Sequence, residues 1–221
     1  IDARYVLFEP AADALARAHT LALLQGSYRW SITYREVVNN TTRGYVRETA
    51  VVENASVYRT RIERNGTVES GTVLVADDPV YADGWNEYRR VERDGTVGYE
   101  RRGLNRDVGV STPLYERPLR VIQWYLSTEE SRLVDVFEDG DSRVFRVQGT
   151  GDSWPRTTDA RTVAVISDEG VVYYLQRSHR PPDWEGRIVV TFRASRLPGV
   201  SVVPPPWYDE ARRAVDNGTA A

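Results

Sequence analysis

The chain has 221 residues, a net charge of −3 at pH 7, and 41% apolar and 10% aromatic residues. That length allows one large or two small domains with a sizeable core, and the near-neutral charge gives no argument for nucleic acid or an anionic membrane surface as partner. Cysteine is absent, which excludes disulfides, thiolate nucleophiles and cysteine metal sites.

The first predicted element is a helix over about 10–26. Pro10 suits a first turn, alanine and leucine recur at three- and four-residue spacing, and Gly26 suits a C-terminal stop. From Tyr28 onward the apolar period becomes two, which is typical of strands with one buried face. The sequence therefore predicts a single helix followed by a long sheet.

About eleven strands are predicted, joined by short connectors that are rich in turn residues. Four of these connectors are Asn65-Gly66, Asp94-Gly95, Asp139-Gly140 and Glu169-Gly170, which tolerate positive φ. Consecutive strands are then antiparallel neighbours. The predicted strands cover roughly 28–38, 43–53, 56–64, 67–76, 85–93, 96–103, 131–139, 142–149, 160–167, 171–180 and 186–195.

A second helix, over about 117–127, is predicted between the sixth and seventh strands, with Pro118 in its first turn. The tail 196–221 contains a run of three prolines at 204–206, a short helix from Trp207 and residues after Asp216 that we expect to fray. We expect a single domain over 1–221. Its fold class is α+β: a strongly curved antiparallel meander, or unclosed β-barrel, with the N-terminal and inserted helices on its concave face.

One apolar face of this meander is larger than two short helices obviously cover, so we expect a cavity that binds a hydrophobic ligand. For Trp30 and Trp124, simple core packing is the alternative. The residues expected to line the cavity are Trp30, Ile32, Tyr34, Tyr58, Ile62, Leu74, Trp124, Phe145 and Phe192.

Five of the seven asparagines begin an Asn-X-Ser/Thr triplet: Asn39, Asn40, Asn54, Asn65 and Asn217. Turn chemistry explains part of this excess, and glycosylation outside the cytoplasm explains the rest, with Asn40, Asn54 and Asn65 as the main candidates. Every basic residue is arginine, which fits either a GC-rich coding bias or adaptation to high salt. The chain opens at Ile1 like a mature or trimmed protein, and we expect membrane association through an anchor upstream of it.

Catalytic chemistry has little support in the sequence. His19 and His179 lack metal-site spacing, and the acidic stretches 138–142 and 168–170 do not follow an EF-hand pattern. A nucleophile elbow and a glycine-rich phosphate loop are also absent. We therefore expect no catalytic residues, no metal and no cofactor. The paired arginines 89–90, 101–102 and 212–213 are interpreted as partners of cross-strand ion pairs, or as a rim that meets lipid headgroups.

The stretches AHTLALLQGSYRWSITY (18–34) and PPPWYDEAR (204–212), within this order of elements, resemble the LolA-like lipoprotein carriers. That group includes the mycobacterial lipid-binding lipoproteins, and the lysine-free, sequon-rich composition is similar to that of haloarchaeal surface lipoproteins. The resemblance implies an open half-barrel with a helical lid, a location outside the cytoplasm and a hydrophobic ligand. It implies no catalytic residues.

Three functions are compatible with this sequence. The first is a non-enzymatic extracytoplasmic carrier or sensor for an acyl or prenyl lipid, or for a lipidated peptide. The second is a cell-surface module with a fully packed core that binds a protein or a glycan. The third, a hydrolase with an acidic site, has no constellation of residues behind it. Nucleic acid is not an expected partner.

Overall fold

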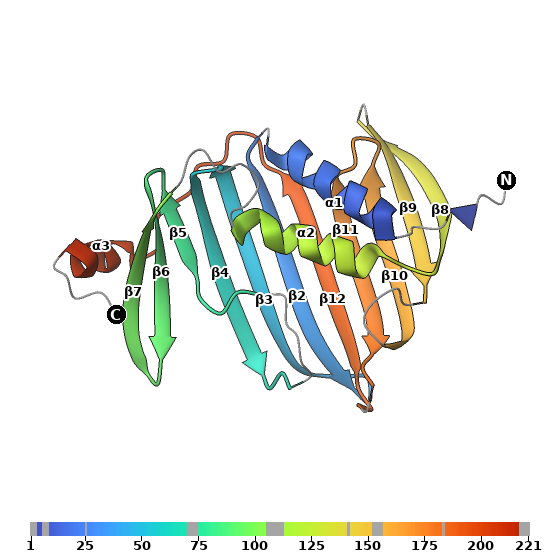
Figure 1. Ribbon diagram of the computed structural model, residues 1–221, viewed down its shortest axis with the longest axis horizontal. Coiled ribbons are helices and arrows are strands. Elements are labelled where there is room, and N and C mark those ends of the chain that lie inside the picture. The colour runs from blue at the N-terminus through green and yellow to red at the C-terminus, as the bar shows by residue number, and fades with distance from the viewer. Residues whose placement is uncertain are drawn as a thin grey trace.

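The computed structural model describes residues 4–5, 9–24, 26–69, 75–104, 113–140, 142–151, 157–182 and 184–216. This part of the chain forms one antiparallel sheet and three helices (Figure 1). In chain order the elements are β1 (Arg4–Tyr5), α1 (Glu9–Leu24), β2 (Tyr28–Val38), β3 (Thr41–Asn54), β4 (Val57–Gly66), β5 (Val80–Asp83), β6 (Asn86–Arg93), β7 (Thr96–Gly103), α2 (Pro113–Leu126), β8 (Glu130–Asp139), β9 (Ser142–Thr150), β10 (Thr158–Ser167), β11 (Val172–Arg180), β12 (Arg187–Arg196) and α3 (Tyr208–Asp216).

The strand order is β1-β8-β9-β10-β11-β12-β2-β3-β4-β5-β6-β7. Two meanders, β2 to β7 and β8 to β12, are therefore joined where β12 pairs with β2. The β12–β2 pair lies in the middle of the sheet. The edge strands are β1 and β7, at opposite ends of the strand order, so the barrel is not closed. Helix α2 connects β7 to β8 and crosses the same face as α1 (Figure 1). The predicted open half-barrel with two helices on its concave face is confirmed.

The helix boundaries differ from the prediction. Helix α1 begins at Glu9 and ends at Leu24, close to the expected 10–26. Helix α2 begins at Pro113, four residues earlier than expected, so Pro118 lies inside the helix and does not open it. Proline needs no amide hydrogen bond at a first helical position, which is why Pro113 suits the start.

One predicted strand and its turn are wrong. No strand covers the described residues of 67–76, and Asn65-Gly66 is not a hairpin turn because both residues still pair with β3. The partner of β4 on its other side is β5, a short strand that was not predicted. Asn39 and Asn40 do form a tight turn, and both have positive φ (49° and 61°), which asparagine tolerates better than most residues.

The main core lies between the sheet and the two helices. Alternating side chains of the central strands, such as Trp30 and Phe192, pack against Ala12 and Ala16 of α1 and Ile122 of α2. This is the period-two face that the sequence predicts, and its burial is the main driving force for docking the helices.

A second, smaller cluster lies on the opposite face of the sheet. Tyr88 of β6 and Tyr99 of β7 pack against Ala211 of α3, and the Tyr208 hydroxyl donates a hydrogen bond to Asp83 (2.7 Å). The C-terminal helix therefore covers the outer surface at the β7 end of the sheet (Figure 1).

Candidate functional site

The concave face is continuous from β10 to β4. The register places Tyr28, Trp30, Ile32 and Tyr34 beside alternate residues of β12 and β3, with Phe192 next to Ile32. Strand alternation points all of these side chains toward the helices. The candidate site is this face together with its cover.

The predicted lining residues fall into three groups. Trp30, Ile32, Tyr34, Tyr58 and Phe192 are at most 2% exposed and lie in the packed core. Half-buried positions are taken by Ile62, Trp124 and Phe145. Leu74 lies outside the described residues. Under the helices the concave face is thus filled by the protein's own side chains.

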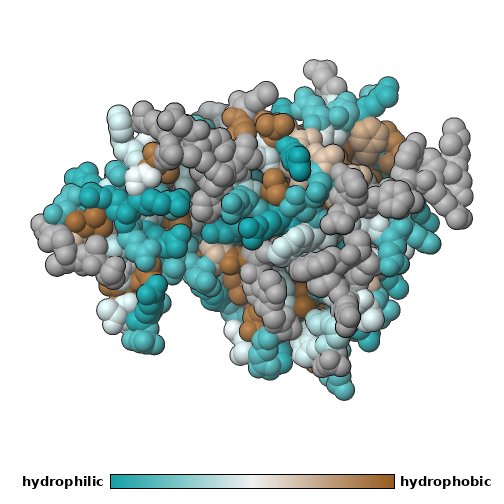
Figure 2. All heavy atoms as spheres, viewed as in Figure 1, coloured by the Kyte–Doolittle hydropathy of each residue, from teal (hydrophilic) through white to brown (hydrophobic). Residues whose placement is uncertain are grey.

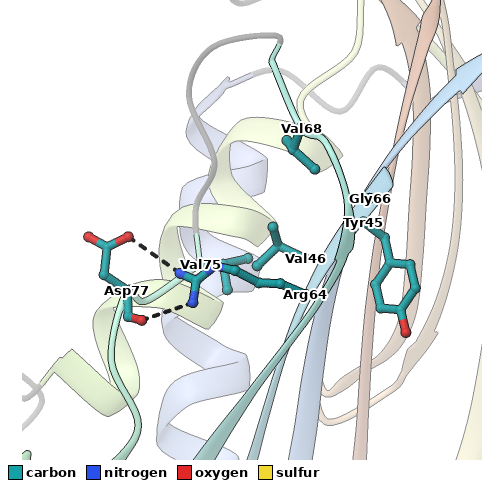
Figure 3. A pocket seen from close by; sticks show the side chains of 7 residues that line it. All are labelled: Tyr45, Val46, Arg64, Gly66, Val68, Val75 and Asp77. Atoms are coloured by element: carbon teal, nitrogen blue, oxygen red, sulfur yellow. Dashed lines mark hydrogen bonds and ion pairs between the residues drawn. The ribbon is translucent and has the colours of Figure 1, made fainter. Parts of the chain in front are cut away.

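A pocket that is open to solvent, called the cavity below, lies beyond the edge of this packed region. Its volume is about 310 Å³, and it is bounded by the ends of β3 and β4 and by the segment that follows β4 (Figure 3). Below α2, apolar side chains also reach the surface among hydrophilic ones (Figure 2). The lining residues are Tyr45, Val46, Arg64, Gly66, Val68, Val75 and Asp77.

Two glycines let the segment after β4 fold back over the sheet. Gly66 has φ +69°, and a side chain at Gly44, its partner in β3, would overlap the backbone of Thr67. Only glycine gives both the positive φ and the close backbone approach. The cavity therefore depends on the Gly44–Gly66 pair, of which only Gly66 was predicted to lie in a turn, with Asn65.

Arg64 forms the charged side of the cavity. Its guanidinium donates to the Asp77 carbonyl (3.1 Å) and the Ala76 carbonyl (3.4 Å) and lies 3.6 Å from the Asp77 carboxylate. The Arg64 side chain is half exposed. A cation thus stands at the edge of a cavity that also has valine walls.

Two buried carboxylates, on β2 and β3, bind backbone amides of the segment between β4 and β5. Glu36 accepts a hydrogen bond from the Glu69 amide (2.9 Å), and Glu48 accepts one from the Ala76 amide (3.0 Å). Both glutamates have 0% exposure. Neither was predicted from the sequence, although Glu36 is in phase with the aromatic residues of β2 and Glu48 is in phase with the apolar residues of β3, and that phase was the available signal.

Glu48 also binds helix α2 through an ion pair with Arg117. Burial raises the pKa of Glu48 above its usual range, and the Arg117 charge and the Ala76 amide act in the opposite direction. The Glu48 carboxylate therefore connects three parts of the fold: strand β3, the segment after β4 and helix α2.

Glu87 forms a comparable junction at the β6 end. It accepts a hydrogen bond from the Tyr58 hydroxyl and pairs with Arg102 (3.3 Å). Burial, followed by the Glu87 charge, raises the pKa of Tyr58. Tyr58 is thus a neutral hydrogen-bond donor, and the Arg102–Glu87 pair fits the predicted role of the arginine clusters.

Both histidines are buried. Burial lowers the pKa of His19 to about 3, and its Nδ1 accepts the Val172 amide (3.1 Å). Burial and the charges of two arginines lower the pKa of His179 to about 4. His179 stacks on Tyr125. Both are therefore neutral packing residues at neutral pH.

Arg177 is a buried cation, with 1% exposure. Its guanidinium donates to the Ser127 carbonyl (3.0 Å) and the Thr162 hydroxyl (3.3 Å). Burial lowers the pKa of Arg177 to about 10, so it stays charged at neutral pH. It ties the end of α2 to β10 and β11.

Strand β8, at the other end of the sheet, carries exposed apolar side chains on both of its faces. Leu133, Val134, Val136 and Phe137 are between 37% and 48% exposed, and the view in Figure 2 shows apolar side chains over the β8–β9 end. Val136 pairs with Phe145, one of the predicted lining residues.

The three main glycosylation candidates, Asn40, Asn54 and Asn65, are exposed. Asn54 has a structural role, because its side-chain oxygen accepts hydrogen bonds from the amides of Ser56 and Val57 (both 2.9 Å). An Asx turn of this kind accounts for the asparagine at that position.

In the described ranges, no group of three or more His, Asp or Glu side chains is placed to hold a metal ion. None of the described helices has the length and apolar character needed to cross a membrane.

Among solved structures, the chain is similar to LprF from Mycobacterium bovis, at 11% identity and a TM-score of 0.40, over 89% of this chain and 97% of that one. It is also similar to a LolA superfamily protein from Nitrosomonas europaea, at 10% identity and a TM-score of 0.29, over 87% and 94% of the two chains. A DUF1329 family protein from Desulfovibrio piger is similar at 8% identity and a TM-score of 0.27, again over 87% and 94%. No family model and no curated protein matches the sequence. The half-barrel described above follows from this chain's own strand order and helix positions.

Proposed function

We propose that the protein is a non-enzymatic, extracytoplasmic carrier or sensor that holds a hydrophobic ligand on the concave face of the half-barrel. The ligand class is an acyl or prenyl lipid, or a lipidated peptide. The observation that carries the proposal is the solvent-open pocket of about 310 Å³, which Val46, Val68 and Val75 line beside the charged side chains of Arg64 and Asp77. That volume lies at the lower end of the range of small-molecule sites.

The cavity adjoins the packed core, because Val46 pairs with Tyr34 in the next strand. A short apolar group fits the cavity alone. A longer chain reaches Trp30, Ile32 and Phe192 only if α2 moves away from the sheet, since these residues are covered. In this proposal α2 is a lid, and the Glu48–Arg117 pair holds it closed.

The exposed triplets at Asn40, Asn54 and Asn65 support a location outside the cytoplasm, with glycosylation at one or more of them. The proposed binding uses only the residues that line the cavity and those that hold the lid, and it assigns none of them a catalytic role.

The test is lipid binding by protein purified without detergent. Native mass spectrometry should show a co-purifying lipid, and a fluorescent fatty acid should bind and be displaced by unlabelled lipid. Val75→Trp, in the cavity wall, should weaken binding by roughly tenfold, which corresponds to about 1.4 kcal/mol.

Val203→Trp is the matched control, because Val203 is 70% exposed and lies outside the cavity lining. It should leave binding unchanged. The proposal fails if no lipid co-purifies and no fatty acid binds, or if the two tryptophan variants bind equally well.

A second candidate function is a protein- or glycan-binding module with a fully packed core. Trp85, 70% exposed in the turn between β5 and β6, is the observation that favours it, since exposed tryptophan stacks on sugars and anchors protein interfaces. Trp85→Ala should then abolish partner or glycan capture while lipid binding is nil in both forms.

A further inference from the structure

The outer face of the sheet carries arginines that lack anionic partners. Strand alternation places them opposite the buried concave row of β2, β3, β10 and β12. All are exposed, and among the described residues no carboxylate lies within ion-pair distance of them. This outer arginine face consists of Arg29, Arg35, Arg47, Arg161 and Arg193.

Strand register shows that these residues form a two-dimensional array. Arg35 and Arg161 lie in one row across β2, β12, β11 and β10, through the pairs with Val189 and Ser178. Arg47 lies in the adjacent row, opposite Thr33. With neighbouring strands about 4.8 Å apart, the array extends over roughly 19 Å from β3 to β10.

Two acidic groups of this face have partners, of which Glu63 is in an ion pair and Glu53 binds a neutral amide. Glu63 pairs with Arg61 (3.4 Å), and Glu53 accepts the Val202 amide (3.0 Å). The net charge of the whole chain is −3, so positive charge concentrated here is balanced by acidic groups elsewhere. Such an asymmetry orients a protein toward an anionic surface.

The side chains on the outer arginine face restrict the class of partner that it can bind. The exposed large apolar side chains of the described residues lie on α1, β7, β8, the β5–β6 turn or the segment after β12, so the face lacks the apolar anchors of a protein interface. Its aromatic residues are few: Tyr45 and Tyr174 are half-buried, and Arg193 lies over the Tyr174 ring at 5.1 Å. Single-stranded nucleic acid needs open aromatic platforms, and a broad sheet face cannot enter a duplex groove.

We infer that the outer arginine face docks on the headgroups of an anionic lipid bilayer. Guanidinium groups bind phosphate oxygens in a bidentate manner, and an array of them matches an array of lipid phosphates. The contact is electrostatic and leaves the opposite, concave face with its cavity directed away from the bilayer.

The experiment is vesicle co-sedimentation of the full chain at about 50 mM salt, where charges are weakly screened. Vesicles of phosphatidylglycerol and phosphatidylcholine should pellet the protein, vesicles of phosphatidylcholine alone should not, and about 500 mM salt should release it. The triple variant Arg35→Gln, Arg47→Gln, Arg193→Gln should partition roughly 100-fold less well, given the usual effect of a basic residue near an anionic surface.

The matched control removes three arginines that already have carboxylate partners: Arg101, Arg120 and Arg196, each changed to glutamine. It has the same net charge as the triple variant and should keep binding within about threefold. Equal urea midpoints of the three proteins show that each is folded.

Three outcomes overturn the inference: equal binding to neutral vesicles, an equal loss in the control variant, or binding to heparin or an oligonucleotide without binding to anionic vesicles. Pelleting by neutral vesicles would point to the apolar surfaces of the concave side. Binding to a soluble polyanion alone would assign the face to a different class of partner.

Discussion

Arg117→Met removes the cation that neutralises the buried Glu48 carboxylate. Glu48 has 0% side-chain exposure and Arg117 has 22%, and only the hydrogen bond from the Ala76 amide remains after the change. Breaking a fully buried pair from one side costs about 3–5 kcal/mol. Because Arg117 is partly exposed, we expect a loss of roughly 2–3 kcal/mol in the free energy of unfolding.

The double variant Glu48→Gln, Arg117→Met keeps an acceptor for the Ala76 amide but carries no buried charge. Its loss should be only about 1 kcal/mol, because the desolvation penalty disappears with the charge. Urea unfolding followed by tryptophan fluorescence measures both values. Lipid uptake by Arg117→Met should also become faster, since α2 is then held less firmly against the sheet.

Low pH should reduce the loss of stability caused by Arg117→Met. The folded-state pKa of Glu48 is already raised by burial, and removal of Arg117 raises it further. Protonation of the folded state then favours folding as pH falls toward the ordinary glutamate pKa of about 4.3. The deficit relative to wild type should therefore shrink between about pH 7.5 and 5. A deficit under about 0.5 kcal/mol, or one that does not change with pH, would refute this account of Glu48.

Three further predictions concern other parts of the fold. The lowered pKa values of His19 and His179 mean that below about pH 6.5 the unfolded chain binds protons that the folded chain does not. Stability should then fall by up to about 1.4 kcal/mol per pH unit per histidine, and His19→Gln should flatten a plot of unfolding free energy against pH. Ala211→Arg, at a fully buried contact of α3, should release the C-terminal helix to limited proteolysis while the tryptophan-monitored core unfolds as in wild type; unchanged proteolysis would contradict the packing described. Gly44→Ala should cost about 1–3 kcal/mol and reduce lipid uptake because it meets the Thr67 backbone, whereas Gly103→Ala, with open space around it, should cost less than about 1 kcal/mol.

Period-two patterning was sufficient to predict the sheet and its buried face. Tyr28, Trp30, Ile32 and Tyr34 alternate with polar residues, and all four are buried. Glu36 continues this alternation and is buried as well, although the hydropathy of glutamate alone predicts that it is exposed. Its burial depends on the amide of Glu69, a partner supplied by tertiary structure, so local reasoning could not place it.

A cavity was predicted, but its position among Val46, Val68 and Val75 was missed for a related reason. An Asn-Gly pair after a strand is a strong hairpin signal, but Gly66 uses its positive φ to send the chain across the sheet, over Gly44. That close approach joins residues from different strands. The β12–β2 pair is equally non-local, and nothing in either strand alone identifies its neighbour.

The central position of that pair has a consequence for folding. The Ser27 hydroxyl binds the Leu197 carbonyl across 170 positions of sequence, so the two strands at the middle of the sheet come from opposite ends of the described chain. Such a contact order slows folding, because loop closure precedes the gain from pairing. Until β12 has been synthesised, the edge of β2 that pairs with it stays open. The nascent chain therefore carries an unpaired strand edge, which favours aggregation, until β12 is made.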